Sequence, residues 1–540
     1  MQVPNSWLWY TLLVVVLVVG VISALEKKRP AWQFYLRKIL HIIVIFVAAL
    51  ASMYLVSIWL PIVSWVASIV LWIAIKLGWF EEVVAGEQAR KPWGMVYFSV
   101  IYAVLTSLPW MLFGPGSHQW LIMRWMNGWS FCTLAFADGL AGIMGRWGTK
   151  FLSLDREQVF GIFKLDGERK SWFGFFVFWL VSVVVGVLFC AMGKELIPNA
   201  VLIDDVVIPQ LIVFGFAVAA VEMVSGKGSD NIFIVVAVWL FSGAMAMSFM
   251  GSPHAIFFQG TGYLLLYMLL SVCAAFGLYR SKLLDNTGVL MAWILAFVVV
   301  VMAGWSLWPL IVFLGLSSVI GRLKKKKYGL SMLGDSKEGK PRDRWQVLAN
   351  GGLYMGCALL VYLINMDVAA FFGLTMDAGV DEKCALLAFY TLSASCADTL
   401  SSEVGQWIGG IPRSIITGKQ IPKGVSGGVT VAGFVGAVIG AVSIGLCIYF
   451  NDWIELKKAL DWSETQIFLS VVSLGILGTV IDSMIGDLFQ CKYMQSDGLL
   501  SDVPDKENFV IAKGVIWVTN DRVNAMTGFV TFFLGGLILF

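Results

Sequence analysis

Acidic side chains interrupt or border several long apolar runs of this 540-residue chain. Asp138, Asp398 and Asp482 lie inside such runs, and Asp230 and Asp521 lie near the ends of others. A carboxylate inside a membrane span is costly, and it marks a function or a buried partner. Carboxylates with amide oxygens suit Mg²⁺, which bridges phosphates while keeping several waters. We therefore expect one metal site from Asp138 and Asp230, and a second from Asp398, Asp482 and Asp521.

Two of these aspartates share a residue pattern. Residues 137–145 read Ala-Asp-x-Leu-Ala-x-x-x-Gly, and residues 397–405 read Ala-Asp-x-Leu-Ser-x-x-x-Gly. In a helix the aspartate, the small residue three positions on and the glycine seven positions on share a face. Such spacing also packs helices together in membranes. Because basic residues lie just outside each span, we favour a binding surface over helix packing alone.

Basic and glycine-rich segments accompany the acids in both halves of the chain. Glycine-rich turns let backbone N–H groups approach phosphate oxygens, and lysine or arginine neutralises transferred charge. The P-loop pattern G-x-x-x-x-G-K-[ST] is absent, so any nucleotide is expected at the inner membrane face. We expect catalytic roles for Asp138, Lys170, Asp230, Asp398, Arg413 and Asp482. Substrate or nucleotide contacts are expected from Gly139, Gly142, Gly145, Arg146, Lys150, Asn231, Glu403, Lys423, Gly427 and Gly428.

The composition excludes a soluble enzyme. Apolar residues make up 59% and charged residues 14%, against about 45–50% and about 25% in soluble domains. The net charge of +3 gives no strong attraction to nucleic acid. Eight cysteines are scattered singly, and only three histidines occur (His41, His118 and His254). A disulfide framework, a structural zinc site and a histidine-rich metal site are therefore not expected.

Apolar runs of about 20 residues, the length that crosses a bilayer, define the expected topology. We expect an all-α polytopic membrane protein with roughly sixteen transmembrane helices in two membrane domains, residues 1–282 and 283–540. Lysine and arginine gather in alternate loops, which places both termini outside and the acidic sites at the cytoplasmic face. These observations indicate a phosphoryl or nucleotidyl transferase with a lipid co-substrate, or a cation-coupled transporter.

The first half resembles the phytol kinase and dolichol kinase family, which is distantly similar to phosphatidate cytidylyltransferases. The resemblance rests on residues 37–41 (Arg-Lys-Ile-Leu-His), 137–148, 169–174 and 221–231. Ala137 stands where relatives often have glycine. The cytidylyltransferase signature ending in Pro-Gly-His-Gly-Gly is absent, which favours a kinase over a CDP-lipid synthase. The resemblance implies phosphate contacts for His41 and Ser171.

The second half, from about Asp285, resembles the membrane family that contains plant phytyl-phosphate kinase. The matching segments are residues 346–352, 398–405, 412–413, 424–429, 482–486 and 520–524. Val425-Ser426 stands where relatives often have threonine and asparagine. The resemblance implies substrate contacts for Asn350 and Asn524.

Together the two resemblances imply a bifunctional membrane lipid kinase. It would phosphorylate an isoprenoid alcohol such as phytol or geranylgeraniol to the monophosphate and then to the diphosphate. The resemblance implies Mg²⁺ and a nucleoside triphosphate, CTP, as donor; membrane lipid is the other expected partner, and nucleic acid is not. Two alternatives are a single-activity lipid kinase or CDP-lipid-type nucleotidyltransferase with a non-kinase half, and a transporter. Without a targeting extension, a prokaryotic plasma membrane is the simplest expected location.

Overall fold

The chain forms two compact helical units, Met1–Val272 and Cys273–Phe540. The expected boundary, after residue 282, follows the end of the helix in which this division falls. The computed structural model describes residues 6–28, 32–77, 93–151, 163–165, 168–196, 204–226, 228–249, 261–281, 283–302, 308–328, 341–365, 376–450, 460–495, 498, 500–502 and 510–540.

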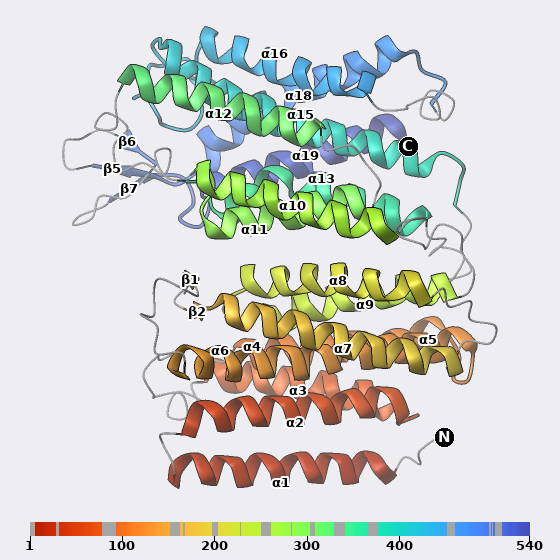
Figure 1. Cartoon of the computed structure of the whole chain (residues 1–540). Coiled ribbons are helices and arrows are strands. Elements are labelled where there is room, and N and C mark those ends of the chain that lie inside the picture. Colours follow the sequence, from red (N-terminus) through yellow and green to blue (C-terminus); the bar gives the residue numbers. More distant parts are fainter. Residues whose placement is uncertain are drawn as a thin grey trace. The chain divides into compact units, whose positions relative to one another are not determined.

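Among the described residues, the first unit consists of helices and one short hairpin (Figure 1). Its helices are α1 (Ser6–Lys28), α2 (Gln33–Tyr54), α3 (Trp59–Lys76), α4 (Trp93–Leu112), α5 (His118–Thr133), the π-helix η2 (Leu134–Asp138), α6 (Gly139–Phe151), α7 (Trp172–Leu196), α8 (Asp204–Val224), α9 (Asp230–Phe249) and α10 (Thr261–Ser281), which runs across the division. The antiparallel strands β1 (Phe163–Leu165) and β2 (Glu168–Lys170) connect α6 to α7, with Phe163 opposite Lys170.

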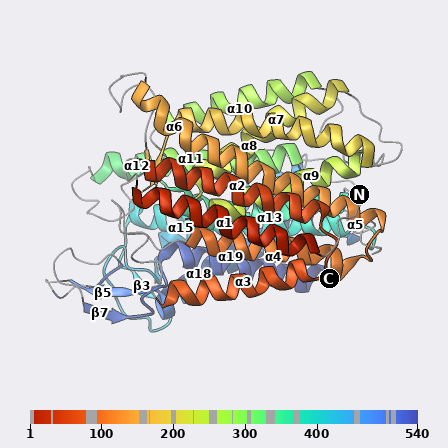
Figure 2. The same cartoon turned by 90° about the horizontal axis from the view of Figure 1, so that it is seen from below.

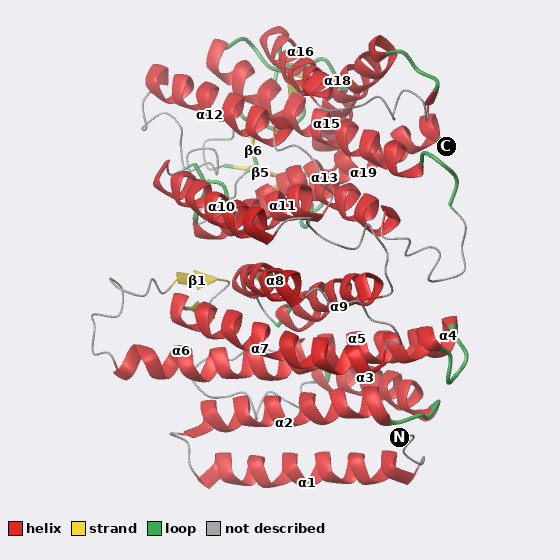
Figure 3. Cartoon of the chain, turned by 45° about the vertical axis from the view of Figure 1, so that its right-hand side comes forward, coloured by secondary structure: helices red, strands yellow, loops and turns green. Residues whose placement is uncertain are grey.

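Among the described residues, the second unit contains the two longest helices of the chain and more strands than the first (Figure 3). Its helices are α11 (Asn286–Phe297), the π-helix η3 (Val298–Met302), α12 (Trp308–Tyr328), α13 (Arg344–Asn365), α15 (Val380–Ile408), α16 (Val431–Leu446), the 3₁₀-helix η5 (Cys447–Phe450), α18 (Glu464–Phe489) and α19 (Asn520–Leu539). Strands β3 (Arg413–Ser414) and β4 (Gly428–Val429) pair antiparallel, and β5 (Lys492–Met494) lies between β6 (Leu500–Ser501) and β7 (Val510–Lys513).

Eleven helices among the described residues are long and apolar enough to cross a membrane. The expected all-α membrane fold is therefore confirmed. The count of sixteen spans is not confirmed: α1, α10 and α11 contain only shorter apolar stretches among these residues. Many apolar side chains on the long helices are exposed, including Leu180 of α7 and Phe533 of α19, as expected where lipid replaces water as the solvent.

Small residues pack the helix that carries each repeated pattern against the next helix. A Cβ atom on Gly145 would lie 3.4 Å from Cα of Gly174 in α7. A Cβ atom on Gly405 would lie 3.4 Å from Cα of Gly433 in α16. The repeated pattern therefore does pack helices, in addition to placing an aspartate on the same face about two turns earlier.

Candidate functional site

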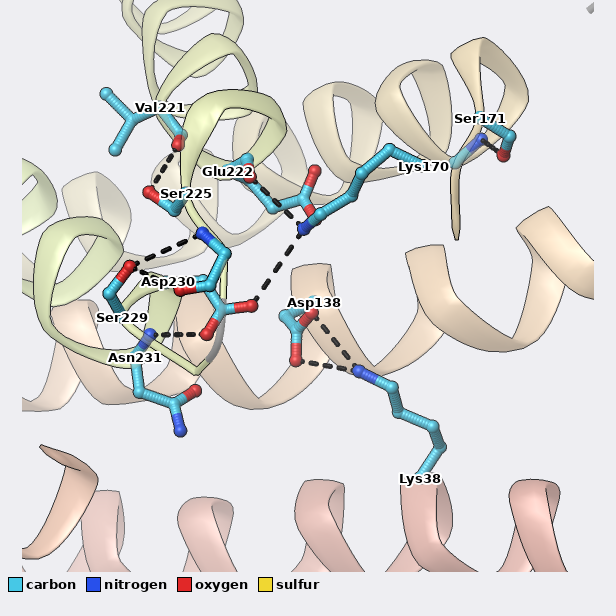
Figure 4. Close-up of polar contacts among 12 residues, drawn as sticks. Lys38, Asp138, Lys170, Ser171, Val221, Glu222, Ser225, Ser229, Asp230 and Asn231 are labelled. Atoms are coloured by element: carbon cyan, nitrogen blue, oxygen red, sulfur yellow. Dashed lines mark hydrogen bonds and ion pairs between the residues drawn. The ribbon is translucent and has the colours of Figure 1, made fainter. Parts of the chain in front are cut away.

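Asp138 lies at the end of the π-helical segment η2, and its side chain is buried. Lys38 of α2 donates to both carboxylate oxygens, with Nζ–O distances of 3.2 and 3.0 Å (Figure 4). Nε2 of His41 lies 3.0 Å from Oδ2 of the same carboxylate. Lys38 and His41 are three positions apart on α2 and so share one face. Asp138 is therefore held by two nitrogen groups from a single helix.

Lys170 connects two further acids (Figure 4). Its buried ammonium group donates to the carboxylate of Glu222 and, at 3.2 Å, to the backbone carbonyl of Glu222. Oδ2 of Asp230 lies 3.9 Å from the same nitrogen. Burial by itself lowers the pKa of Lys170, but Glu222 and Asp230 outweigh this effect and raise the pKa above its usual value. Lys170 therefore stays charged at neutral pH.

Carboxylate oxygens of Asp138, Glu222 and Asp230 all lie within 4.8 Å of one another. Three oxygen donors at this spacing can share one hard cation such as Mg²⁺, whose remaining ligands are waters and phosphate oxygens. The residues present therefore fit the expected metal. They also fit a polyphosphate, because Lys38 contacts Asp138 while Lys170 contacts Glu222 and Asp230 of the same cluster.

A tight glycine turn presents Asp230. Gly228 has a φ of +83°, and a Cβ atom there would lie 2.6 Å from Cα of Gly94 at the start of α4. The turn therefore requires glycine for both its conformation and its close approach. Nδ2 of Asn231 donates to the backbone carbonyl of Gly94 at 2.7 Å, which fixes the start of α9 beside α4.

The remaining residues expected in the first site have several different neighbours. Gly142 leaves room for Lys38, because a Cβ atom would lie 2.6 Å from Cε of the lysine. Arg146 is exposed, with its guanidinium 4.5 Å from the ring centre of Phe34. Gly139 lies against Ile42, Ser171 caps α7 by accepting from the N–H of Gly174 at 3.1 Å, and the side chain of Lys150 is outside the described residues.

Sequence reasoning left Lys38 and Glu222 out of the expected site. Both had a signal: Lys38 lies three positions before His41, and Glu222 is a carboxylate inside an apolar run. The sequence alone did not show that Glu222 faces Lys170, because that contact joins residues 52 positions apart.

The second unit pairs two carboxylates with each other. The carboxylate of Asp398 on α15 lies beside that of Asp482 on α18, close enough for the two to interact directly. Thr527 of α19 donates to Oδ2 of Asp482 at 2.9 Å. Among the described residues, no lysine or arginine forms an ion pair with either acid. Two contacting carboxylates repel each other, so such a pair either shares a proton or holds a cation.

Other residues expected in this site form separate contacts. Nδ2 of Asn524 donates to Oδ1 of Asn350 at 3.2 Å. Glu403 pairs with Lys324 of α12 at 2.8 Å. Asp521 lies in the first turn of α19, one turn before Asn524.

A buried acid with two lysine partners lies at the end of α18. The buried Asp487 accepts hydrogen bonds from Ser414 of β3, from Lys492 at 3.3 Å and from Lys513 at 2.9 Å. Gly427, at a φ of +83°, passes so close that a Cβ atom would lie 2.4 Å from Cβ of Asp487. None of the roles expected from the sequence was assigned to Asp487.

The loop of residues 409–430 carries the other expected phosphate-binding residues of this unit. Arg413 is exposed and donates to the carbonyl of Gly418 at 3.1 Å. Lys423 is also exposed. Gly428 pairs with Ser414 in the hairpin. Figure 2 shows β3, β5 and β7 gathered at one end of α18, consistent with the contacts of Asp487.

The two units share one local construction. In each, an aspartate-bearing helix leads through a β-hairpin into a helix capped by a hydroxyl three positions before a glycine. A Cβ atom on Gly145 would lie 3.0 Å from Oγ of Ser171, and one on Gly405 would lie 3.1 Å from Oγ1 of Thr430. The helix contacts agree as well: α6–α7, α7–α8, α8–α9 and α5–α9 correspond to α15–α16, α16–α18, α18–α19 and α15–α19.

Comparison with known proteins gives a family for the second unit. The model of the integral membrane protein family DUF92 matches residues 269–532. Protein PGR of Arabidopsis thaliana is 28% identical over 282 residues, covering 50% of this chain and 94% of the relative. An uncharacterized membrane protein of Methanocaldococcus jannaschii is 30% identical over 227 residues, covering 42% of this chain and 82% of the relative. No solved structure matches.

In each comparison, about half of this chain aligns with most of the relative's length. The first unit, Met1–Val272, lies almost wholly outside the family match. The resemblance of that first unit to isoprenoid-alcohol kinases stays a prediction. By its matched segment, residues 269–532, the chain belongs to the DUF92 family of integral membrane proteins.

Proposed function

We propose that this protein is a membrane phosphotransferase that phosphorylates an isoprenoid alcohol in its first unit and the resulting monophosphate in its second. One observation supports this proposal most strongly: three carboxylates and two lysines converge around Asp138. Such a set can bind a metal-bound polyphosphate and also accept a proton. The resemblance of both halves to lipid kinases supplies the acceptor class, and CTP is the expected donor.

In the proposed first step, the alcohol oxygen forms a bond to the γ-phosphorus, and the bond to the leaving nucleoside diphosphate breaks. The alcohol proton passes to a carboxylate, for which Asp138 is our candidate. The ammonium groups of Lys38 and Lys170 neutralise negative charge on the phosphates, which is the main contribution of a protein to phosphoryl transfer. When bound to Asp138, Glu222 and Asp230, Mg²⁺ supplies further neutralisation.

In the proposed second step the acceptor is already an anion, so a general base is less important than neutralisation of charge. Asp398 and Asp482 are our candidates to hold the metal there. Arg413 and Lys423 extend from an exposed loop and are candidates to bind phosphate. We place both sites at the cytoplasmic face, where nucleotide is available.

The test uses the purified protein in liposomes with Mg²⁺, CTP and geranylgeraniol or phytol, with lipid products identified by mass spectrometry. We expect the monophosphate first and the diphosphate later. Monophosphate alone would remove the second step from the proposal. A CDP-linked lipid would identify a nucleotidyltransferase instead. No phosphorylated lipid with any nucleoside triphosphate across several alcohols would reject the enzyme and favour a cation-coupled transporter.

A further inference from the structure

An apolar segment outside the long helices is exposed along its whole length. Residues 510–517 read Val-Ile-Ala-Lys-Gly-Val-Ile-Trp and comprise strand β7 and the turn that follows it. Val510 is 68% exposed, Ile516 63% and Trp517 57%. Contiguous exposed apolar side chains mark an interaction surface rather than a surface facing water.

The chain places this segment close to the membrane surface. Strand β5 begins three residues after α18 ends at Phe489, and Trp517 lies three residues before α19 begins at Asn520. Because three extended residues span about 10 Å, the start of β5 and Trp517 each lie near the end of an apolar helix. Figure 1 shows the sheet at that end of the helices of the second unit.

The exposed surface also continues onto the lipid-facing side of α19. Arg522, in the first turn of α19, lies over the ring of Trp517 at 5.6 Å, and Phe529 and Phe533 are exposed further along the same helix. Tryptophan beside basic residues is typical of the level of the lipid headgroups. The composition therefore matches a bilayer interface better than it matches a surface in water.

We propose that residues 510–517 form an interfacial element whose apolar side chains insert between the lipid headgroups and the acyl chains. The partner is the phospholipid bilayer itself. Amphipathic segments with tryptophan on an apolar face bind membranes in this way, with binding strength that scales with the apolar area buried.

The interfacial strand is also tied to the loop of residues 409–430. Lys513 of β7 pairs with Asp487, whose carboxylate also accepts a hydrogen bond from Ser414 and whose Cβ packs against Gly427. Insofar as the proposed function holds, this connection keeps the candidate phosphate-binding loop next to the headgroups, where an isoprenyl monophosphate presents its phosphate.

The insertion can be tested without any assay of phosphotransfer. Seven of the eight cysteines are buried and Cys273 is exposed, so a Cys273→Ser background allows one nitroxide label at Ile516→Cys. A matched control label is placed at Thr417→Cys, which is exposed at the tip of the 409–430 loop. The labelled full chain is reconstituted in phosphatidylcholine–phosphatidylglycerol vesicles, and collision rates with O₂ and with a water-soluble nickel chelate are measured.

We expect the label at position 516 to collide more with O₂, which concentrates in the bilayer, and less with the nickel chelate than the control label does. Val510→Cys provides a second labelled position should Ile516→Cys fold poorly. Nickel collisions equal to those of the control would overturn the proposal. Protection from both reagents would also overturn it, because the segment would then lie against protein, such as a second copy of the chain. Because neither readout needs nucleotide, its failure is distinct from failure of the proposed function.

Discussion

Asp138 and Asp398 occupy the same place in the construction that the two units share, yet their surroundings differ in charge. Asp138 is held by Lys38 and His41 from α2. Asp398 instead faces a second acid, Asp482 from α18. The shared small-residue packing therefore determines where the carboxylate lies, and the helices packed around it determine its electrostatic environment.

This contrast assigns different charge requirements to the two sites. The first has ammonium groups of its own, because Lys38 and Lys170 both contact its acids. The hairpin residue that precedes the capping hydroxyl is Lys170 in the first unit and Val429 in the second. Asp398 and Asp482 therefore depend on a proton or a bound cation to relieve their repulsion.

The largest effect is expected from removing either aspartate. Asp138→Asn should reduce phosphorylation of the alcohol by about 10²–10⁴-fold, the usual contribution of a positioned proton-transfer group, and leave phosphorylation of supplied monophosphate intact. Asp398→Asn should cause monophosphate to accumulate. Each variant is the control for the other in a mass-spectrometric assay. Loss of both steps from one substitution would mean that the sites are not separate.

Breaking the buried pair of the first unit should destabilise the protein. Lys170→Met leaves Glu222 without its ammonium partner, at a cost of about 3–5 kcal/mol for a buried pair. The double variant Lys170→Met with Glu222→Gln should recover part of that loss, as measured by thermal unfolding in detergent. A double variant no more stable than Lys170→Met would mean that Glu222 is not the group left unpaired.

Replacing the packing glycine should destabilise the protein by a similar amount in both units. Gly145→Leu and Gly405→Leu each force a side chain into a contact of 3.0 or 3.1 Å with a capping hydroxyl, at a cost of about 1–3 kcal/mol. Gly20→Leu and Gly315→Leu are matched controls, because no atom lies within 4 Å of a Cβ there. In thermal unfolding, Gly145→Leu and Gly405→Leu should have lower melting temperatures than the two controls. If Gly145→Leu lowered the melting temperature and Gly405→Leu did not, the equivalence of the units would be contradicted.

The smallest expected effect is a change in how strongly Mg²⁺ stabilises the protein when the acid pair of the second unit is altered. Asp482→Asn removes one of two repelling carboxylates, so it should stabilise the protein slightly when Mg²⁺ is absent. It should also reduce the rise in melting temperature that Mg²⁺ causes. The comparison is with Asp285→Asn, a change at a helix cap. A larger rise with Mg²⁺ in Asp482→Asn than in the unmodified protein would refute a cation at this pair.

The membrane fold was predictable because apolar runs of span length determine it directly. The repeated aspartate pattern also predicted a correspondence between the halves, and the structure extends this correspondence to the hairpins and to the caps at Ser171 and Thr430. Which side chains contact one another between membrane helices could not be predicted from the sequence. The Lys38–Asp138 and Asp398–Asp482 contacts each join helices whose rotation about their own axes is not encoded in local spacing.

The long-range contacts of the expected phosphate-binding residues could not be predicted either. Arg413 and Lys423 were grouped with Asp398 because basic residues and acids occur together in that half of the chain. The structure instead places the loop of Arg413 and Lys423 against Asp487, through Ser414 and Gly427. A short polar motif identifies a useful residue type, but the carboxylate that it contacts depends on long-range packing.

The central claim is that two separate sites act in sequence on one membrane lipid. The most direct measurement places Asp138→Asn and Asp398→Asn together in the same proteoliposomes with geranylgeraniol, CTP and Mg²⁺. Neither variant alone should yield diphosphate from the alcohol. The mixture should restore diphosphate formation, because monophosphate made by Asp398→Asn diffuses to the second site of Asp138→Asn, which is intact. Diphosphate from the unmodified protein but none from the mixture would contradict the claim.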